Sequence, residues 1–251
     1  MKFPETLSAG RCALIEDAAK TLQREYGVGF LGMVLSGSAG RGVETERSDL
    51  DVIVVVTPEL VERPLRRDTE LELLPVTLKH LETLAVFGDD QWGYRWSYAW
   101  APTLLDHTDG RIERAIERQT RLSAEEVQAL LELRLDAWIN LTYRTLKSTR
   151  DGNLLAARLD AAEAISPFLD VVFALDGQVR PYSKYLTWTL EHHPLPSWPT
   201  EDLLQTIEQY LAGNAEAIRQ SLRQVQAYGL PLVQETFDDW AAEQYDALRR
   251  P

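Results

Sequence analysis

Residues 35–56 read LSGSAGRGVETERSDLDVIVVV: a turn rich in small residues, then two aspartates, then five consecutive β-branched residues. An apolar run, Phe30–Leu35, leads into the turn. Because side chains alternate along a strand, Asp49 and Asp51 share one face of the strand that they open. Neighbouring carboxylates repel each other, whereas Mg²⁺ prefers carboxylate oxygens and completes its octahedron with water and phosphate oxygens. The stretch therefore predicts a strand–turn–strand unit with a divalent-cation site.

The turn itself indicates a phosphate. Gly37 and Ser38 lie at the end of the first predicted strand, where a backbone with few side-chain atoms approaches a phosphate and offers N–H groups. Together with the two aspartates, this predicts a nucleoside triphosphate, its metal and a reaction at phosphorus. The alternative is a pair of solvated aspartates at the entrance of a strand.

These residues resemble a known signature. Gly37-Ser38, ten intervening residues and Asp49-Leu50-Asp51 between apolar residues resemble the pattern of the DNA polymerase β-like nucleotidyltransferase superfamily, which includes aminoglycoside and lincosamide nucleotidyltransferases. The resemblance implies an α+β nucleotidyltransferase fold, with a small mixed sheet flanked by helices. It also implies that Asp49 and Asp51 hold two Mg²⁺ ions on the triphosphate, and that Gly37 and Ser38 hold the outgoing phosphates.

The superfamily usually places a third carboxylate on the next strand, shortly before a helix that starts with Thr/Ser-Leu. Counting back from Thr77-Leu78, Glu72 fits this pattern best and Glu70 is the second choice. Such a carboxylate would complete the metal site or take the proton from the attacking hydroxyl. A solvated strand face is the alternative.

Three basic residues are candidates for binding the triphosphate. Arg41 and Arg47 lie inside the signature loop, and Lys184 matches a "pro-x-x-lys" stretch of related bacterial enzymes that have a helical tail. The resemblance implies that Lys184 reaches the triphosphate. A lysine that lies along a helix surface is the alternative.

Two acidic residues of the second half are candidates for the acceptor. Asp160 and Glu163 are three apart on a predicted helix and so share a face. In antibiotic-modifying relatives, acidic residues of the helical half bind ammonium groups of the acceptor or act as a base. A plain surface face is the alternative, and Asp106, in an Asp-Gly turn region, is expected to be structural.

Composition limits the partners. The chain has 251 residues with 26 basic and 39 acidic side chains, a formal net charge of −13. This balance argues against a broad nucleic-acid surface and is compatible with a small or cationic acceptor. The single cysteine, Cys12, excludes an internal disulfide, and no apolar run is long enough for a membrane span. We expect a soluble, cytoplasmic protein with no membrane partner.

Periodicity predicts two domains, residues 1–120 as an α/β catalytic half and residues 121–251 as a helical half. Ser123 to Glu126 reads as a capping box, and helical spacing follows it. The predicted helices are 9–26, a short one after Thr77, 123–149, 153–175 with a break or bend at Pro167, 181–192, 200–229 and 233–248, and the predicted strands are 30–35, 52–56, 70–76 and 103–105.

The resemblance therefore implies a Mg²⁺-dependent nucleotidyltransferase that moves a nucleoside monophosphate onto a hydroxyl of a small acceptor such as an aminoglycoside or a lincosamide. ATP, which would supply AMP, is the commonest donor in such relatives, but nothing in the sequence selects the base. Asp49, Asp51 and Glu72 would be the catalytic and metal-binding residues. Two alternatives remain: adenylylation of a protein partner, as by antitoxin-like enzymes, and a nucleotide-binding regulatory protein without turnover. Sequence gives no oligomeric state.

Overall fold

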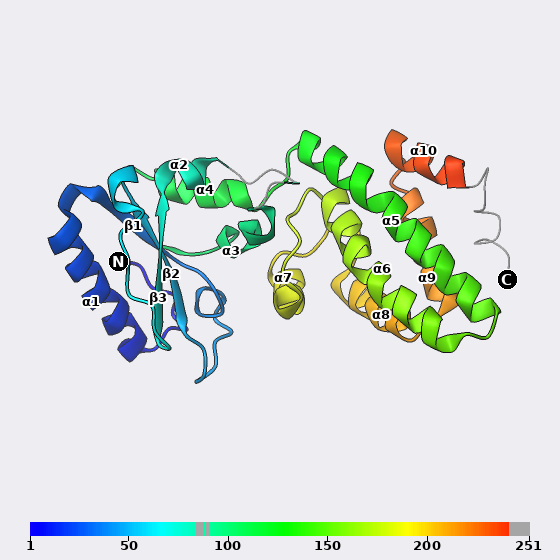
Figure 1. Ribbon diagram of the computed structural model, residues 1–251, viewed down its shortest axis with the longest axis horizontal. Coiled ribbons are helices and arrows are strands. Elements are labelled where there is room, and N and C mark those ends of the chain that lie inside the picture. The colour runs from blue at the N-terminus through cyan, green and yellow to red at the C-terminus, as the bar shows by residue number, and fades with distance from the viewer. Residues whose placement is uncertain (84–87, 89–90, 241–251) are drawn as a thin grey trace. The chain divides into compact units, whose positions relative to one another are not determined.

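The computed structural model describes residues 1–83, 88 and 91–240 and divides the chain into two compact units, Met1–Arg121 and Leu122–Pro251. The first unit contains a sheet with helices, and the second is built from helices (Figure 1). The predicted combination of a small mixed sheet and a following all-helical region is confirmed. Among the described residues, no helix is both long and apolar enough to cross a membrane.

The sheet of the first unit has the strand order β3-β2-β1-β4. The central strands β1 and β2 are antiparallel, as are β1 and β4, whereas β2 and β3 run parallel, so the sheet is mixed. The elements of this unit are α1 (Ala9–Tyr26), β1 (Phe30–Leu35), β2 (Leu50–Val56), β3 (Leu71–Thr77), α2 (Leu78–Glu82), α3 (Arg95–Tyr98), β4 (Thr103–Asp106) and α4 (Arg111–Gln119).

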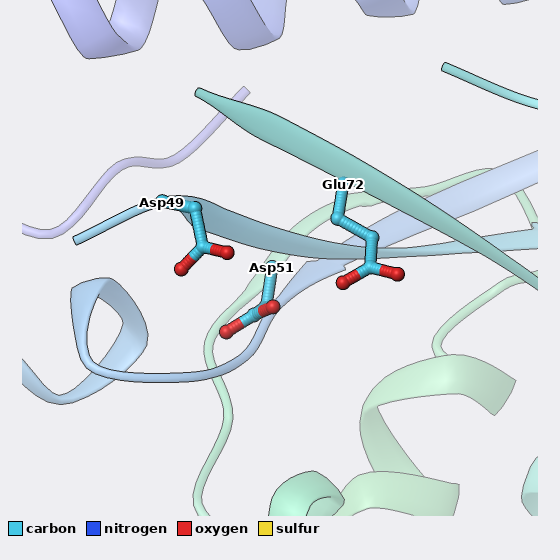
Figure 2. A group of neighbouring side chains, drawn as sticks. All are labelled: Asp49, Asp51 and Glu72. Carbon is cyan, nitrogen blue, oxygen red and sulfur yellow. The ribbon is translucent and has the colours of Figure 1, made fainter. Parts of the chain in front are cut away.

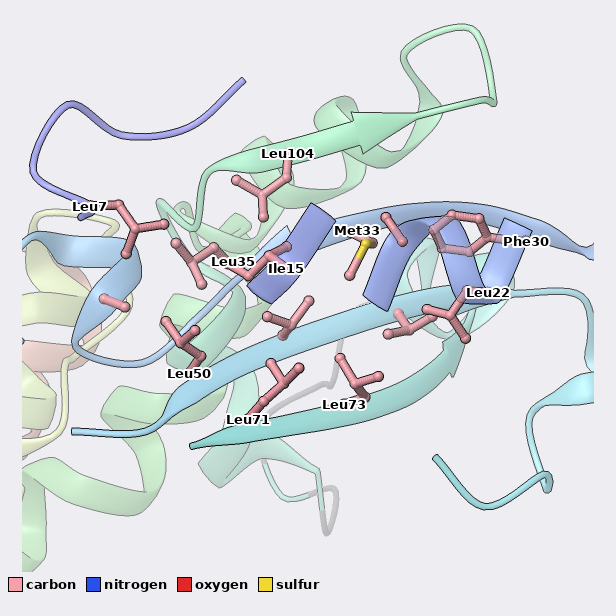
Figure 3. Packing of buried hydrophobic residues seen from close by; sticks show 14 of the residues in the cluster. Leu7, Ile15, Leu22, Phe30, Met33, Leu35, Leu50, Leu71, Leu73 and Leu104 are labelled. Carbon is pink, nitrogen blue, oxygen red and sulfur yellow. The ribbon is translucent and has the colours of Figure 1, made fainter. Parts of the chain in front are cut away.

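Because side chains alternate along the strands, each face of the sheet packs into a hydrophobic core of its own. On one face, Met33 and Val54 pack with Ile15 and Leu22 of α1 in a cluster that also takes in Leu104 (Figure 3). On the other face, the remaining strand positions pack against α2 and α4; the buried members of that cluster are Val34, Ile53, Val55, Leu78, Leu81, Ala101, Ile112, Ala115 and Ile116. Both faces of β2 are therefore buried, which explains its unbroken β-branched run.

The register of the parallel pair positions the site. Asp51 lies directly beside Glu72, the second residue of each strand, and the pairing continues to Val56 and Thr77. Parallel strands begin at the same edge of a sheet, so side chains from both strand starts are brought together there.

The second unit begins with the predicted capping box. Ser123 Oγ accepts from the N–H of Glu126, and a Glu126 carboxylate oxygen accepts from the N–H of Ser123 at 2.8 Å. The helices are α5 (Ala124–Arg150), α6 (Leu154–Leu175), α7 (Leu186–His192), α8 (Thr200–Leu211), α9 (Ala215–Gln226) and α10 (Pro231–Trp240).

An aromatic cluster forms the centre of this unit. The Phe168 ring lies 5.4 Å from Trp138, 5.3 Å from Trp198 and 5.2 Å from Tyr210, measured between ring centroids. All four side chains are buried. Such rings bury large apolar areas, and their contacts connect α5, α6 and α8.

Several predicted elements differ from the structure. Helix α6 runs through Pro167 without a break, because that turn is buried and tertiary packing holds the helix together. The predicted helix 200–229 is two helices, separated at Gly213-Asn214, where Asn214 caps α9. Helix α7 begins at Leu186 rather than at Pro181, α4 was not predicted, and residues 241–248 of the predicted last helix lie outside the described residues.

Candidate active site

Three carboxylates gather at the start of β2 and β3. Asp49 directly precedes β2, Asp51 is its second residue and Glu72 is the second residue of β3. Each offers a carboxylate oxygen, and these three oxygens lie within 4.8 Å of one another (Figure 2). The sequence prediction that Asp49 and Asp51 lie together is confirmed as geometry, and Glu72 is the carboxylate that joins them.

This donor set fits a hard divalent cation. Mg²⁺ binds oxygen at about 2.1 Å, so two ligand oxygens on opposite sides of one ion lie about 4.2 Å apart. Oxygens within 4.8 Å of one another therefore need only small side-chain rotations to share an ion. Within the described residues Asp49 forms no ion pair, so its negative charge is compensated by no neighbouring cationic side chain.

Gly37 lies against this cluster, and a larger residue would not fit there. Its φ is +59°, a left-handed conformation that favours glycine. A Cβ at this position would lie 2.0 Å from Oδ2 of Asp51. Ser36 extends the β1–β2 pairing by donating its N–H to the Asp51 carbonyl at 2.8 Å, so the turn and the aspartate are fixed to each other.

The turn leaves backbone donors for a ligand. The N–H of Gly40 bonds the Ser36 carbonyl, and the N–H of Arg41 bonds the Ser38 carbonyl, which closes the turn as a short 3₁₀ segment. Among the described residues, the N–H groups of Gly37 and Ser38 have no backbone acceptor. Successive free N–H groups in a turn are a concave site for an anion such as a phosphate.

Arg41 occupies a different place from the one predicted. The side chain is buried, at 5% exposure of the residue, and its guanidinium donates to the carbonyls of Trp96, Ser97 and Ala99 as well as Gly37. It also stacks on the Trp96 ring at 4.4 Å from the centroid. These carbonyls hold the guanidinium in the interior. Arg41 therefore stabilises the turn from its buried side, and its guanidinium does not face a phosphate.

The structure separates the remaining loop candidates. Arg47 is exposed, so its predicted contact with phosphate stays a prediction. The Glu70 side chain is 73% exposed, and its Oε2 lies 3.5 Å from a guanidinium nitrogen of Arg66. Glu70 is not part of the carboxylate cluster, so Glu72 is the residue that lies with the two aspartates. The pairing of Glu72 with Arg67, at 2.7 Å, was not predicted, because it depends on a hairpin that the spacing does not reveal.

Asp106 is structural, as expected. Oδ1 accepts from the N–H and the hydroxyl of Thr108, and Oδ2 accepts from the N–H of Glu113 in the first turn of α4. Burial alone would raise the pKa of Asp106, but these hydrogen bonds outweigh it and lower the pKa below its usual value. The carboxylate therefore serves to start α4.

In the second unit, the predicted acidic pair is divided. Asp160 is buried and forms an ion pair with Arg144, in which Oδ1 of Asp160 lies 2.8 Å from a guanidinium nitrogen, whereas Glu163 is exposed. Lys184 is exposed, with its Nζ 5.2 Å from the Tyr185 ring centroid. The predicted roles of these residues toward the acceptor and the triphosphate stay predictions.

A comparison with protein families matches the segment that holds this site. Residues 15–96 match the model of a family described as the nucleotidyltransferase domain, a segment that contains the turn and all three carboxylates. The crystal structure of a nucleotidyltransferase-like protein from Exiguobacterium sibiricum 255-15 aligns with 93% of this chain and 89% of that chain, at 12% identity and a TM-score of 0.44. No curated protein matches the chain.

The first unit thus has the nucleotidyltransferase fold, a mixed four-stranded sheet with helices on both faces. A domain of this family supports a role in nucleotide transfer in general terms.

Proposed function

We propose that the protein is a Mg²⁺-dependent nucleotidyltransferase that moves a nucleoside monophosphate, AMP from ATP, onto a hydroxyl of a small acceptor. One observation carries the proposal: three carboxylates within 4.8 Å adjoin a glycine turn with two backbone N–H groups that have no backbone acceptor among the described residues. Like charges are costly to gather, so their convergence beside an anion-binding turn favours a cation and a polyphosphate together.

The roles follow from position. Asp49 and Asp51 would hold two cations, and the N–H groups of Gly37 and Ser38 would hold the outgoing phosphates. Bound Mg²⁺ supplies neutralisation of the charge on the phosphate oxygens. The acceptor oxygen bonds to the α-phosphorus, the bond to the oxygen that bridges to the β-phosphate breaks, and pyrophosphate leaves. Glu72 would complete the metal site, in which case the hydroxyl proton passes to water, or would itself take that proton.

A small cationic acceptor suits the chain best. The net charge of −13 favours ammonium-bearing molecules, and an aminoglycoside or a lincosamide combines such groups with hydroxyls. Because Asp160 is already paired with Arg144, the exposed Glu163 is the stronger candidate for contacting an acceptor ammonium group.

The test is pyrophosphate release with Mg²⁺, each of the four nucleoside triphosphates, and a panel of aminoglycosides and lincosamides. Asp51→Asn is the inactive variant. Asp17→Asn is the matched control, because it makes the same chemical change at an exposed aspartate of α1 that pairs with Lys20. We expect release that depends on one antibiotic, is lost by at least about a hundredfold in Asp51→Asn, and is retained in Asp17→Asn.

Two other outcomes would change the conclusion. If the protein binds Mg²⁺-nucleotide but releases no pyrophosphate with any antibiotic, this acceptor class is rejected and a protein acceptor is favoured. A pull-down followed by mass spectrometry for adenylylation would then identify that acceptor. A chain that neither binds nucleotide nor releases pyrophosphate would reject the enzymatic assignment.

Lys184 is proposed to contact the triphosphate, on the strength of its exposed ammonium group and the motif that it shares with related enzymes. Lys184→Gln should raise the KM for the nucleotide about tenfold and leave the KM for the acceptor unchanged. Lys147→Gln, another exposed lysine of the same unit, is the control. Equal KM values for both variants would remove Lys184 from the site.

A further inference from the structure

The cationic side chain of Arg67 contacts the carboxylate cluster. Nε of Arg67 is 2.7 Å from Oε1 of Glu72. The Arg67 side chain is 80% exposed, whereas the Glu72 side chain is only 17% exposed. The guanidinium thus approaches from solvent and contacts the one carboxylate of the three that lies on β3.

The approach is fixed by backbone pairing. Arg67 lies opposite Glu72 in an isolated antiparallel bridge, and the N–H of Leu73 donates to the Arg66 carbonyl at 2.9 Å. The turn of this hairpin is closed by Asp68, whose Oδ1 accepts from the N–H groups of Glu70 and Leu71.

Asp68 makes the turn independent of Arg67. The hydrogen bond from Arg66 and the two backbone N–H groups lower the pKa of Asp68 to about 2, so the turn carries an ionised cap at neutral pH. The hairpin is therefore ordered by residues other than Arg67, and it presents Arg67 to Glu72 whatever the state of the ion pair.

The ion pair and a metal compete for the same carboxylate. A cation held by Glu72 and a guanidinium paired with the same carboxylate would lie close together and repel each other. We propose that Arg67 is a placeholder for the cation: it neutralises and orients Glu72 in the metal-free protein and leaves when the cation binds. This inference rests on the proposed function, because it takes Glu72 as a metal ligand.

Exposure makes the exchange possible. Ion pairs of exposed side chains change an equilibrium by only about two- to fivefold, so a divalent ion displaces one readily. Arg41 shows the opposite arrangement, since its guanidinium is enclosed by carbonyls and cannot leave without unfolding the turn. Arg67 is thus a positioning residue that sets the affinity for the cation.

The test is a titration of the full chain with Mn²⁺ alone, which substitutes for Mg²⁺ and is detected by its electron paramagnetic resonance signal. We expect Arg67→Gln to bind Mn²⁺ about two- to fivefold more tightly than the wild type. Arg66→Gln is the matched control: it makes the same charge change one residue away, but its partners are Asp68 and Glu70. The N–H groups of Glu70 and Leu71 still bond Asp68 in this variant and keep the turn closed. The Mn²⁺ affinity of Arg66→Gln should equal that of the wild type.

A double-variant cycle isolates the contact. In a Glu72→Gln background, adding Arg67→Gln should leave the Mn²⁺ affinity unchanged, because the carboxylate for which the two cations compete is no longer charged. Thermal unfolding of each variant confirms that the compared proteins are folded.

The possible failures are distinct. If Arg67→Gln binds Mn²⁺ with wild-type affinity, or if Arg66→Gln binds it as tightly as Arg67→Gln, the placeholder role of Arg67 is overturned. The proposed function is kept in that case as long as Mn²⁺ binding requires Asp51. An unchanged effect of Arg67→Gln in the Glu72→Gln background also overturns it. Absence of Mn²⁺ binding by the wild type overturns the metal site itself, and the placeholder with it.

Discussion

The two units treat their charged groups in opposite ways. At the start of β2 and β3, three carboxylates lie within 4.8 Å of one another, and the adjoining turn leaves two N–H groups without a backbone acceptor among the described residues. In the helical unit, Asp160 pairs with Arg144, and Asp170 lies 3.1 Å from both Arg134 and Arg180.

One hydrogen-bonded chain in the helical core is also satisfied within the fold. The indole N–H of Trp138 donates to the Tyr210 hydroxyl at 3.1 Å, and the Ser221 hydroxyl donates to the Ile218 carbonyl. The Tyr210 proton is therefore directed to Ser221 Oγ, at 2.6 Å. Charges that are compensated within the fold serve stability, whereas three carboxylates gathered at one edge of the sheet mark where a cation can bind.

The largest effect is expected at the glycine turn. Gly37→Ala places a Cβ 2.0 Å from Oδ2 of Asp51, so the carboxylate has to move. A displacement of about 1 Å in a catalytic group costs about a hundredfold in rate, and we expect at least that loss of pyrophosphate release. Gly177→Ala in the helical unit is the matched control, because its φ of +64° is similar and a Cβ there has no atom within 4 Å.

Gly177→Ala should lower the free energy of unfolding by about 1 kcal/mol, the cost of a left-handed alanine, and leave the activity unchanged. Loss of activity in both variants would show that backbone strain, and not the position of Asp51, decides the outcome. Loss in neither would show that a Cβ at position 37 does not disturb the site. Urea unfolding and the pyrophosphate assay on the same preparations distinguish these results.

The same chemical change should have opposite effects on stability in the two units. Asp170→Asn leaves two arginines without their carboxylate, and we expect the free energy of unfolding to fall by about 1–3 kcal/mol, since the pair is partly buried. Asp49→Asn removes one of three like charges and should leave stability equal to or above that of the wild type. Urea unfolding measures both. A loss in Asp49→Asn as large as that in Asp170→Asn would make Asp49 a structural residue.

Burial of Tyr210 makes the helical unit sensitive to alkali. Burial raises the pKa of Tyr210 to about 12, and its side-chain hydrogen bonds with Ser221 and Trp138 offset this only in part. Above about pH 10 the unfolded phenol ionises while the folded one stays protonated, so stability is full below pH 10 and falls by about 2–3 kcal/mol as pH rises to 12.

Tyr210→Phe should lower the free energy of unfolding by about 1 kcal/mol at pH 7 and remove this part of the alkaline loss. Urea unfolding between pH 7 and 12 measures it, with Tyr94→Phe, a side chain 61% exposed, as the control. Part of the slope remains, because burial also raises the pKa of Tyr228 to about 12. A profile of Tyr210→Phe parallel to that of the wild type would show that the hydroxyl is not enclosed.

Local patterns predicted the elements that carry the site. The bounds of α1 and β1 match the prediction, and the predicted β2, β3 and Thr77 cap agree within two residues, because alternation, caps and β-branched runs act over short distances. The convergence of Glu72 with Asp51 followed from the resemblance, and the parallel register now supplies its physical reason.

Long-range contacts account for what was missed. Arg41 looked like a phosphate ligand because it lies in the turn, but the carbonyls that enclose it come from a segment 55–58 residues away. The contact of Arg67 with Glu72 depends on a hairpin of charged residues with no apolar alternation to reveal it. Helix α4 and the break at Asn214 did leave signals, an i, i+3, i+4 apolar spacing and an N-cap.

The smallest effect is expected where stability depends on a single local contact. Ser123→Ala removes the hydroxyl that accepts from the N–H of Glu126 at the start of α5, and caps of this kind contribute about 1 kcal/mol. Ser123→Thr keeps the oxygen and should retain most of the stability. Urea unfolding should separate the two variants, and Mn²⁺ affinity should be the same for both, because the capping box lies outside the carboxylate cluster. A change in Mn²⁺ affinity with Ser123→Ala would mean that the helical unit influences the metal site, and the contrast between the charged groups of the two units would no longer hold.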